Sequence, residues 1–199
     1  MIRLLILLSF LFSSLSSISQ DKWKLSKDKE GIKVYLADVP KSDYKNIKVL
    51  ATMEGTYDKL ISVLTNVSKY KDWVYNNKTG YVIKKISPTE LYIYTETSLP
   101  WPASNRDAVV HMKIDRDKQN RFLKVIEVGV PNYIPEKEDK VRVLKAHISW
   151  HVTMPTPSTI QITYFFEADP GGSVPGWLVN SFADKGPYET FKNLKKMLK

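Results

Sequence analysis

The chain of 199 residues contains no cysteine. No disulfide bond can therefore support its fold, and its stability has to come from the burial of apolar side chains. The chain also contains no glycine-rich phosphate loop, no internal repeat and no evident interdomain linker. These absences argue against a phosphate-loop nucleotide-binding protein and against a repeat array, and they favour a single domain.

The N-terminal apolar run, Leu4–Phe12, is nine residues long, well short of the roughly 20 residues of a membrane-spanning helix. Arg3 precedes this run, and small residues at Ser17 and Ser19 follow it. This order is typical of a secretory signal peptide rather than of an uncleaved anchor. We therefore expect residues 1–19 to be removed and residues 20–199 to form one domain of a secreted or periplasmic protein.

Basic residues outnumber acidic ones by 30 to 21. Without the predicted signal peptide, which contains one arginine, the net charge is about +8. A basic surface favours anionic partners such as acidic membranes, although dispersed basic residues also fit an ordinary solvated surface. Because the aromatic residues are not interleaved with arginines on one strand face, no nucleic-acid partner is expected.

Most of the chain has the alternation, the β-branched composition and the turn punctuation of strands. Two strands are predicted first, then a segment of helical period at Tyr57–Val67, and then six more strands joined as antiparallel hairpins. The predicted strands are Ile32–Ala37, Ile47–Met53, Tyr81–Ser87, Leu91–Ser98, Ala108–Asp115, Phe122–Val130, Val143–Met154 and Thr159–Ala168.

The last segment, Val174–Leu198, has the pattern of a long helix with Ser173 as its N-cap. Gly186-Pro187 interrupts it, and an internal proline bends a helix, so a kink is predicted there. The apolar face of the preceding strands has to be covered, and this helix can cover it. The sequence thus predicts an α+β fold in which a curved antiparallel sheet wraps around a long C-terminal helix and leaves an internal cavity.

Two stretches carry a resemblance to a known family: LPWPASNRD at residues 99–107 and DPGGSVPGWLVNSF at residues 169–182. The first resembles the Arg-Asp corner of START domains, which are lipid-transfer members of the helix-grip superfamily. The second resembles the entry to their last helix. The resemblance implies a tunnel between sheet and helix that holds one lipid or sterol-like molecule and is entered near the loops at one end of that helix. We expect a lipid-binding or lipid-transfer protein that is not an enzyme. The N-terminal helical part of larger members is reduced here to about Lys22–Ser26.

The ligand would then be enclosed by the inner faces of the strands and by the first part of the last helix. If the inward face of a strand is assigned one residue out of register, the predicted residues point outward and their neighbours point inward. For each residue, ordinary packing in the core is the alternative to ligand contact. The predicted ligand-binding residues are Tyr92, Tyr94, Met112, Ile148, Trp150, Tyr164, Phe166, Trp177, Leu178 and Phe182.

The corner at residues 99–107 contains a tryptophan between two prolines, which fix the backbone around it. Trp101 is expected either to touch a membrane or cover the mouth of the cavity, or else only to fill the corner. Arg106 and Asp107 are expected to form a structural salt bridge to a neighbouring strand, with contact to the ligand as the alternative. Gly186 and Pro187 are a candidate hinge for opening.

Catalytic chemistry is weakly represented, and no metal site or cofactor is expected. His147 and His151 stand four positions apart in a strand, where roughly 13 Å separates them, too far for one ion. Glu96 and Glu127 fall in candidate inner strands and could bind a head group or act as a base. A helix-grip enzyme of the cyclase or hydrolase kind therefore remains the alternative to a monomeric lipid carrier, and a structural module with a filled core is a third reading.

Overall fold

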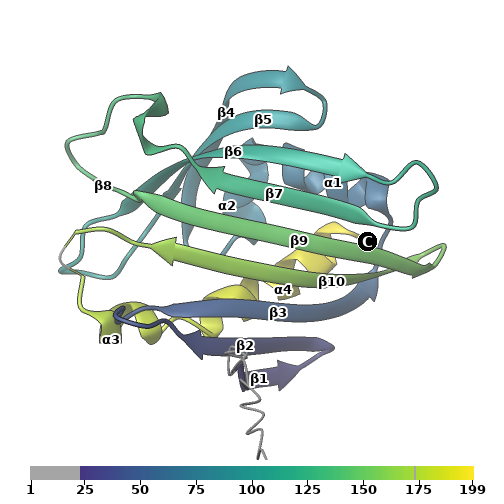
Figure 1. Ribbon diagram of the computed structural model, residues 1–199, viewed down its shortest axis with the longest axis horizontal. Helices are drawn as coiled ribbons and strands as arrows, with labels where there is room; N and C mark the ends of the chain where they lie inside the picture. The colour runs from purple at the N-terminus through teal and green to yellow at the C-terminus, as the bar shows by residue number, and fades with distance from the viewer. Residues whose placement is uncertain (1–22, 173) are drawn as a thin grey trace, which may run out of the picture.

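The computed structural model describes residues 23–172 and 174–199, so the predicted signal peptide and Ser173 lie outside the described residues. In this part of the chain, ten strands form one sheet in the order β1-β2-β3-β10-β9-β7-β6-β5-β4, with β8 parallel to β6. All other neighbours are antiparallel (Figure 1). The strands are β1 Lys24–Lys29, β2 Ile32–Asp38, β3 Lys45–Glu54, β4 Asn77–Ser87, β5 Glu90–Thr97, β6 Arg106–Arg116, β7 Leu123–Gly129, β8 Val141–Arg142, β9 Lys145–Thr156 and β10 Thr159–Asp169.

Helices α1, α2 and α4 lie behind the sheet in Figure 1, on what we call its inner face; the face toward the viewer is the outer face. The predicted α+β fold, with a long C-terminal helix packed on an antiparallel sheet, is confirmed. The helical elements are α1 Tyr57–Thr65, η1 Val67–Lys69, α2 Tyr70–Trp73, η2 Pro131–Tyr133, α3 Gly176–Asn180 and α4 Lys185–Met197.

The N-terminal segment differs from the prediction. Residues 24–29 form strand β1, paired antiparallel with β2, where a short helical remnant was expected. The sequence KLSKDK has almost no apolar alternation, because β1 is an edge strand with both faces largely exposed. Its conformation is set by its backbone hydrogen bonds to β2, which leave little trace in the side-chain pattern.

The C-terminal segment forms two helices, α3 and α4, joined by a turn at residues 181–184. The predicted kink at Gly186-Pro187 is therefore wrong in position. Pro187 lies in the first turn of α4, where the backbone N–H groups have no partner inside the helix, so a proline there removes no helical hydrogen bond. Any hinge between the two helices lies in the turn before Pro187.

Helix α4 packs on the inner face through an aromatic cluster. The ring centre of Phe191 lies 5.4 Å from that of Trp150 on β9 and 5.3 Å from that of Tyr164 on β10. Trp150 and Tyr164 are themselves 4.7 Å apart in an edge-on arrangement. Since β9 and β10 pair with Trp150 opposite Tyr164, the register of these two strands creates the site that Phe191 fills.

The corner at residues 99–107 is tied to the turn before α3 by Arg106. Its Nε donates to the carbonyl of Pro170 at 2.8 Å, and its Nη2 donates to the carbonyl of Gly171 at 3.0 Å. Gly171 has a positive φ of 66°, a conformation that favours glycine and turns the chain toward α3. Because of these bonds, the corner and the entry to α3 are held together.

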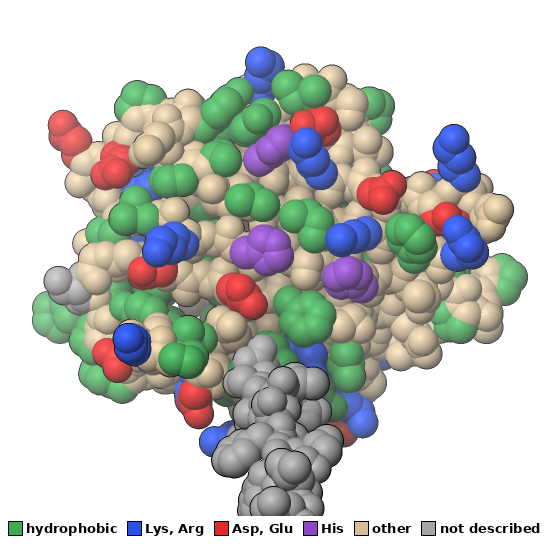
Figure 2. All heavy atoms as spheres, viewed as in Figure 1, with side chains coloured by type: hydrophobic (Ala, Val, Ile, Leu, Met, Phe, Trp, Pro, Cys, Tyr) green, Lys and Arg blue, Asp and Glu red, His purple; other side chains and the backbone are tan. Residues whose placement is uncertain are grey.

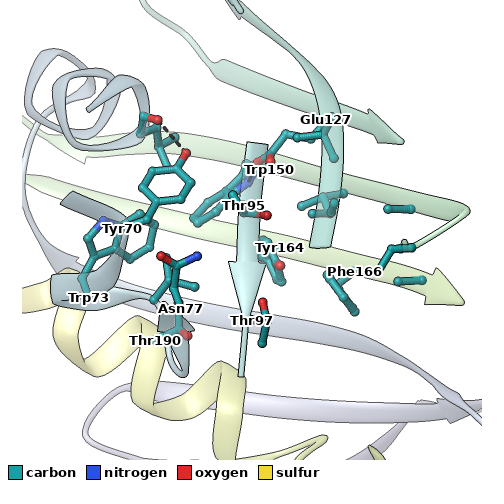
Figure 3. Close-up of a pocket in the computed structure, with 18 of the residues that line it drawn as sticks. Tyr70, Trp73, Asn77, Thr95, Thr97, Glu127, Trp150, Tyr164, Phe166 and Thr190 are labelled. Carbon is teal, nitrogen blue, oxygen red and sulfur yellow. Dashed lines mark hydrogen bonds between the residues drawn. The ribbon is translucent and has the colours of Figure 1, made fainter. Parts of the chain in front are cut away.

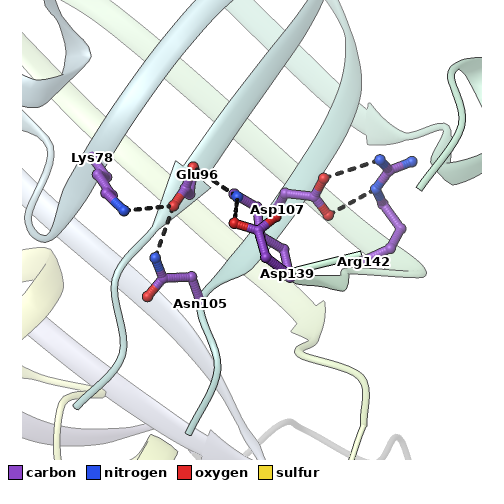
Figure 4. A network of polar contacts seen from close by, with 7 residues as sticks. Lys78, Glu96, Asn105, Asp107, Asp139 and Arg142 are labelled. Carbon is purple, nitrogen blue, oxygen red and sulfur yellow. Dashed lines mark hydrogen bonds and ion pairs between the residues drawn. The ribbon is translucent and has the colours of Figure 1, made fainter. Parts of the chain in front are cut away.

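Asp107 pairs with Arg142 rather than with Arg106 (Figure 4). The two carboxylate oxygens accept from Nε at 2.9 Å and from Nη2 at 3.0 Å, and both side chains are 1% exposed. Arg142 also donates to the carbonyls of Pro131, Ile134 and Pro135. This arginine therefore fastens the segment at residues 130–142 across the outer face of the sheet.

Removing the Asp107 carboxylate should destabilise the fold strongly, because Arg142 would remain buried without a counter-charge. We expect Asp107→Ala to lower the free energy of unfolding by about 3 to 5 kcal/mol in urea titrations. The Arg121–Asp117 pair, whose arginine is exposed, provides the control, and Arg121→Ala should cost less than about 1 kcal/mol. Similar losses in the two variants would contradict the structural role of the buried pair.

Candidate functional site

A cavity of about 210 Å³ lies between the inner face of the sheet and α4. It is lined from α1, α2 and α4 and from strands β4, β5, β6, β7, β9 and β10. In Figure 3, Tyr70 and Trp73 of α2 stand on one side and Tyr164 and Phe166 of β10 on the other. The lining is mostly apolar, as is usual in sites that enclose a small hydrophobic molecule.

Four of the predicted ligand-binding residues line this cavity: Ile148, Trp150, Tyr164 and Phe166. They lie on β9 and β10, where apolar and polar residues alternate strictly along the sequence. The alternation places one full set of side chains on the inner face. Their contact with a ligand stays a prediction, whereas their position around the cavity is set by the strand register.

Tyr92 and Tyr94 lie on the other face of the sheet, because Thr95 and Thr97 of the same strand line the cavity. The face of β5 was thus assigned one residue out of phase. Tyr94 is nevertheless fully buried, since the segment at residues 130–142 covers it and places Lys137 Nζ 4.0 Å from its ring centre. Tyr92 stacks on Tyr133 of the same segment, with ring centres 4.1 Å apart.

The other four predicted residues also lie away from the cavity lining. Met112 is fully buried in the core on the inner face, beside the cavity rather than on its wall. Leu178 and Phe182 belong to α3 and the turn after it, and Trp177 is 72% exposed. The turn at residues 181–184 redirects the chain, so α4 supplies Phe191 and Thr190 to the cavity instead.

Glu127 of β7 is the acidic residue that reaches into the cavity. It is 7% exposed, and Trp150 Nε1 donates a hydrogen bond of 3.1 Å to its Oε1. Burial raises the pKa of Glu127 to about 7, and the Trp150 hydrogen bond offsets only part of that effect. Burial and the nearby Glu127 carboxylate raise the pKa of Tyr164 and of Tyr70, so both phenols stay protonated.

Glu96, the other candidate carboxylate, is not among the residues that line the cavity. It accepts a hydrogen bond of 2.8 Å from Asn105 Nδ2, and Lys78 Nζ lies 3.3 Å from its Oε1. Lys140 Nζ lies 3.7 Å from its Oε2. Glu96 thus belongs to a network of polar contacts that joins β4, β5 and the segment at residues 130–142.

Asn77, at the start of β4, is a cavity residue that sequence reasoning missed. Its side chain is 9% exposed, and its Oδ1 accepts no hydrogen bond within the described part of the chain. Its backbone N–H donates to the carbonyl of Val74 at 3.1 Å, which fixes the residue after α2. In Figure 3 the Asn77 side chain lies between Trp73 and the cavity. A single asparagine at a turn carries no pattern that would have revealed this place.

Nothing among the described residues resembles a metal centre, because no group of three or more His, Asp or Glu side chains comes together there. Figure 2 shows the histidine side chains on the outer face of the sheet, away from the cavity. His111 lies 2.8 Å from the Glu90 carboxylate and stacks on Tyr92. No helix in residues 23–172 or 174–199 is long and apolar enough to cross a membrane.

The raised pKa of Glu127 makes stability depend on pH. Because the folded protein holds this proton more tightly than the unfolded chain, the free energy of unfolding should fall as the pH rises from about 4.5 to about 7. In the parent protein this fall in the free energy of unfolding should be on the order of 3 kcal/mol. Glu127→Gln stays neutral and should not show it. Urea unfolding at pH 4 and pH 8 measures how the difference in the free energy of unfolding between parent and variant changes with pH.

Glu90→Gln is the matched control on the outer face. The pKa of Glu90 is lowered, mainly by the His111 hydrogen bond, so this variant should lose stability relative to the parent as the pH rises. As the pH rises, Glu127→Gln should thus gain stability relative to the parent, whereas Glu90→Gln should lose it. A Glu127→Gln effect that does not change with pH would contradict the burial of an ionisable group in the cavity.

Comparison with known proteins gives the cavity a context. The START domain family model matches residues 11–199. The fold is similar to that of a STAR-related lipid transfer protein fragment from Xanthomonas axonopodis, with a TM-score of 0.81 and 32% identity over 89% of this chain and 99% of that one. It is also similar to human STARD10, with a TM-score of 0.76 over 91% of this chain and 74% of that one; at 22% identity this likeness shows the fold alone.

By sequence, the chain is 29% identical to the phosphatidylcholine transfer protein of Mus musculus over 180 residues, which are 87% of this chain and 82% of that protein. It is 28% identical over 194 residues to an uncharacterised protein of Pseudomonas aeruginosa, covering 98% of this chain and 95% of the relative. The family model spans the sheet, the corner at residues 99–107 and both C-terminal helices. The chain belongs to the START domain family, whose members bind or transfer lipids.

Proposed function

We propose that this protein encloses one hydrophobic lipid between the sheet and α4 and transfers it between membranes in an exported compartment, without catalysing a reaction. The observation that carries the proposal is the apolar cavity of about 210 Å³ on the inner face of the sheet. Membership of the START family supports it, as does the likeness to phosphatidylcholine transfer proteins. A carrier of this kind shields apolar surface that otherwise costs about 25 cal/mol per Å² in water.

The size of the cavity implies that the protein opens to load its ligand. Ligand pockets commonly measure about 300 to 1,000 Å³, and this cavity is smaller. A whole lipid therefore requires outward movement of the elements around it. The turn at residues 181–184 separates α3 from α4, so α3 can move while α4 keeps its contact with Trp150 and Tyr164.

Two exposed tryptophans mark the end of the molecule that would meet a membrane. Trp101 is 91% exposed, and Trp177 is 72% exposed. Arg106 holds the corner that carries Trp101 against the turn that leads to α3 and Trp177. Tryptophan is enriched at membrane–water interfaces, because its ring is apolar and its N–H is polar. The pair therefore supports membrane contact at this end.

The lysines of the last turn of α4 lie elsewhere, because the C-terminus and α3 are at opposite ends of the molecule in Figure 1. Leu198 packs near Gly55 and Ile160, at the start of α1 and of β10, far along the sheet from the corner. Lysines at this place cannot bring the corner at residues 99–107 to an acidic membrane. Membrane contact at the mouth relies on the tryptophans.

One observation favours a second candidate, a helix-grip enzyme that uses Glu127 as a general base. Its pKa of about 7 is suited to proton transfer at neutral pH. Within the described cavity lining, however, no histidine, lysine or second carboxylate stands beside it. The raised pKa values of Tyr70 and Tyr164 make both phenols weak acids, and the Tyr70 hydroxyl already donates to the Leu64 carbonyl, so neither is a good proton donor to pair with Glu127. Carriage therefore fits the cavity better.

Filling the cavity tests carriage directly. Ala108 lies on the cavity wall, and Ala108→Phe should reduce the lipid that co-purifies with the protein by roughly tenfold in native mass spectrometry. Val128→Phe is the matched control, because Val128 lies on the outer face of β7 and is exposed. Circular dichroism checks that both variants fold. Equal lipid content in the parent and the filled variant would place the lipid elsewhere, and turnover of a hydrophobic substrate lost in Glu127→Gln would favour the enzyme.

Trp101→Ala tests membrane contact. Loss of the exposed indole should slow transfer between vesicles several-fold, since the side chain contributes to the membrane-bound state. The lipid content of the purified protein and its melting temperature should stay unchanged, because Trp101 makes little contact with the folded core. Trp101→Phe keeps an aromatic ring and should retain most of the transfer rate. An unchanged rate in Trp101→Ala would overturn the role of this tryptophan in membrane contact.

A further inference from the structure

The cavity contains one carboxylate and no counter-charge. Among the described residues that line it, Glu127 is the one with a side chain that can carry charge at neutral pH; lysine, arginine and histidine are absent from this set. The remaining polar groups are the asparagine amide, hydroxyl groups and the indole N–H groups of Trp73 and Trp150. An anion placed in this cavity would find no cationic partner and would lie near a carboxylate.

Neither of the two buried arginines can supply the missing cation. All five N–H groups of Arg142 are engaged, two by Asp107 and three by backbone carbonyls. Arg106 is held by the carbonyls of Ser104, Pro170 and Gly171. Turning either guanidinium inward would break the contacts that fasten the corner or the segment at residues 130–142. A buried phosphate would therefore lack a counter-charge, which is strongly unfavourable.

The cavity offers two acceptors without a donor, on Glu127 and Asn77, and one donor without an acceptor, the indole N–H of Trp73. Glu127 Oε1 accepts from Trp150, and no described residue donates to Oε2. Asn77 Oδ1 is buried in the same wall without a donor. A buried acceptor without a partner is unfavourable, and a ligand that brings an O–H or N–H group would satisfy it.

From the lone buried carboxylate and the absence of a counter-charge around it, we infer that the ligand is an uncharged lipid whose head group donates a hydrogen bond, an alcohol or an amide, and that Glu127 is its acceptor. The inference rests on the proposed function and names the class of lipid carried. The phosphodiester of a phospholipid is excluded from the interior. Some relatives of this chain are named as phosphatidylcholine transfer proteins. The inference gives this chain a different class of lipid.

Three lipids with the same two acyl chains test this: a diacylglycerol, its methyl ether, which lacks the hydroxyl, and a phosphatidylcholine. The full chain is incubated with vesicles that contain all three lipids, separated from them, and its bound lipid is identified by native mass spectrometry. We expect the diacylglycerol to be bound roughly tenfold more than either of the others. Since this comparison uses the parent protein, it does not depend on a variant folding.

Glu127→Leu then assigns the preference to the carboxylate. It should bind the diacylglycerol and its methyl ether equally, because the acceptor is gone while the apolar walls remain. Glu90→Leu removes a carboxylate on the outer face and should keep the parent's preference. Both variants are checked by circular dichroism.

The outcomes separate the inference from the function on which it rests. Phosphatidylcholine bound as well as diacylglycerol, or equal binding of the alcohol and its ether by the parent protein, would overturn the inference and leave lipid carriage intact. Retention of the preference in Glu127→Leu would overturn the role of Glu127. If the protein removes no lipid at all from the vesicles, the proposed function falls, and the inference falls with it.

Discussion

The contact of Phe191 with Trp150 and Tyr164 sets how α4 lies against the sheet. Three large rings meeting at one point hold the helix away from the strands on either side of that point, where the side chains are too small to close the gap. Ala108, Ala146 and Ala168 line the resulting space. The cavity is thus a consequence of large residues at the helix contact and small ones beside it. Dense core packing elsewhere keeps the arrangement rigid.

One end of the molecule is organised by buried charge. Arg106 and Arg142 use backbone carbonyls as most of their acceptors, so each one fixes the course of an irregular segment. Carbonyls of turns have no strand partner and would be costly to bury alone. The arginines satisfy them and at the same time join the exposed corner, the entry to α3 and the segment at residues 130–142. These parts lie at the end of the sheet where Thr97, Ala146 and Ala168 line the cavity, so polar structure at this end supports an apolar interior.

Glu127 stands apart from this pattern, because it is a buried carboxylate with a single protein donor. A group of this kind lowers stability in the empty protein, and a site that binds a ligand is a place where such strain is useful. The same residue fits general-base chemistry, but its surroundings offer a recognition site rather than a second catalytic group. Lipid recognition therefore gives the more complete account of its position.

Much of the fold followed from periodicity. The alternation along β9 and β10 identified both the strands and the side chains that face the cavity, because one face of each strand is buried and the other is polar. The helical spacing at residues 57–67 identified α1, and Leu64 of that helix reaches the cavity wall. The corner at residues 99–107 and the entry to α3 were enough to indicate the family.

Tertiary structure decided which element covers each apolar face. Periodicity shows that a side chain is buried but not what buries it. Tyr94 was therefore predicted to face inward, although the segment at residues 130–142 covers it on the outer face. The partner of Asp107 lies 35 residues along the chain, at a distance that no local pattern records. The place of the helix break depends on how α4 docks, and the cavity depends on volumes summed over many elements. By itself the sequence determined the strands, the terminal helix and the family; contacts between distant segments determined the site.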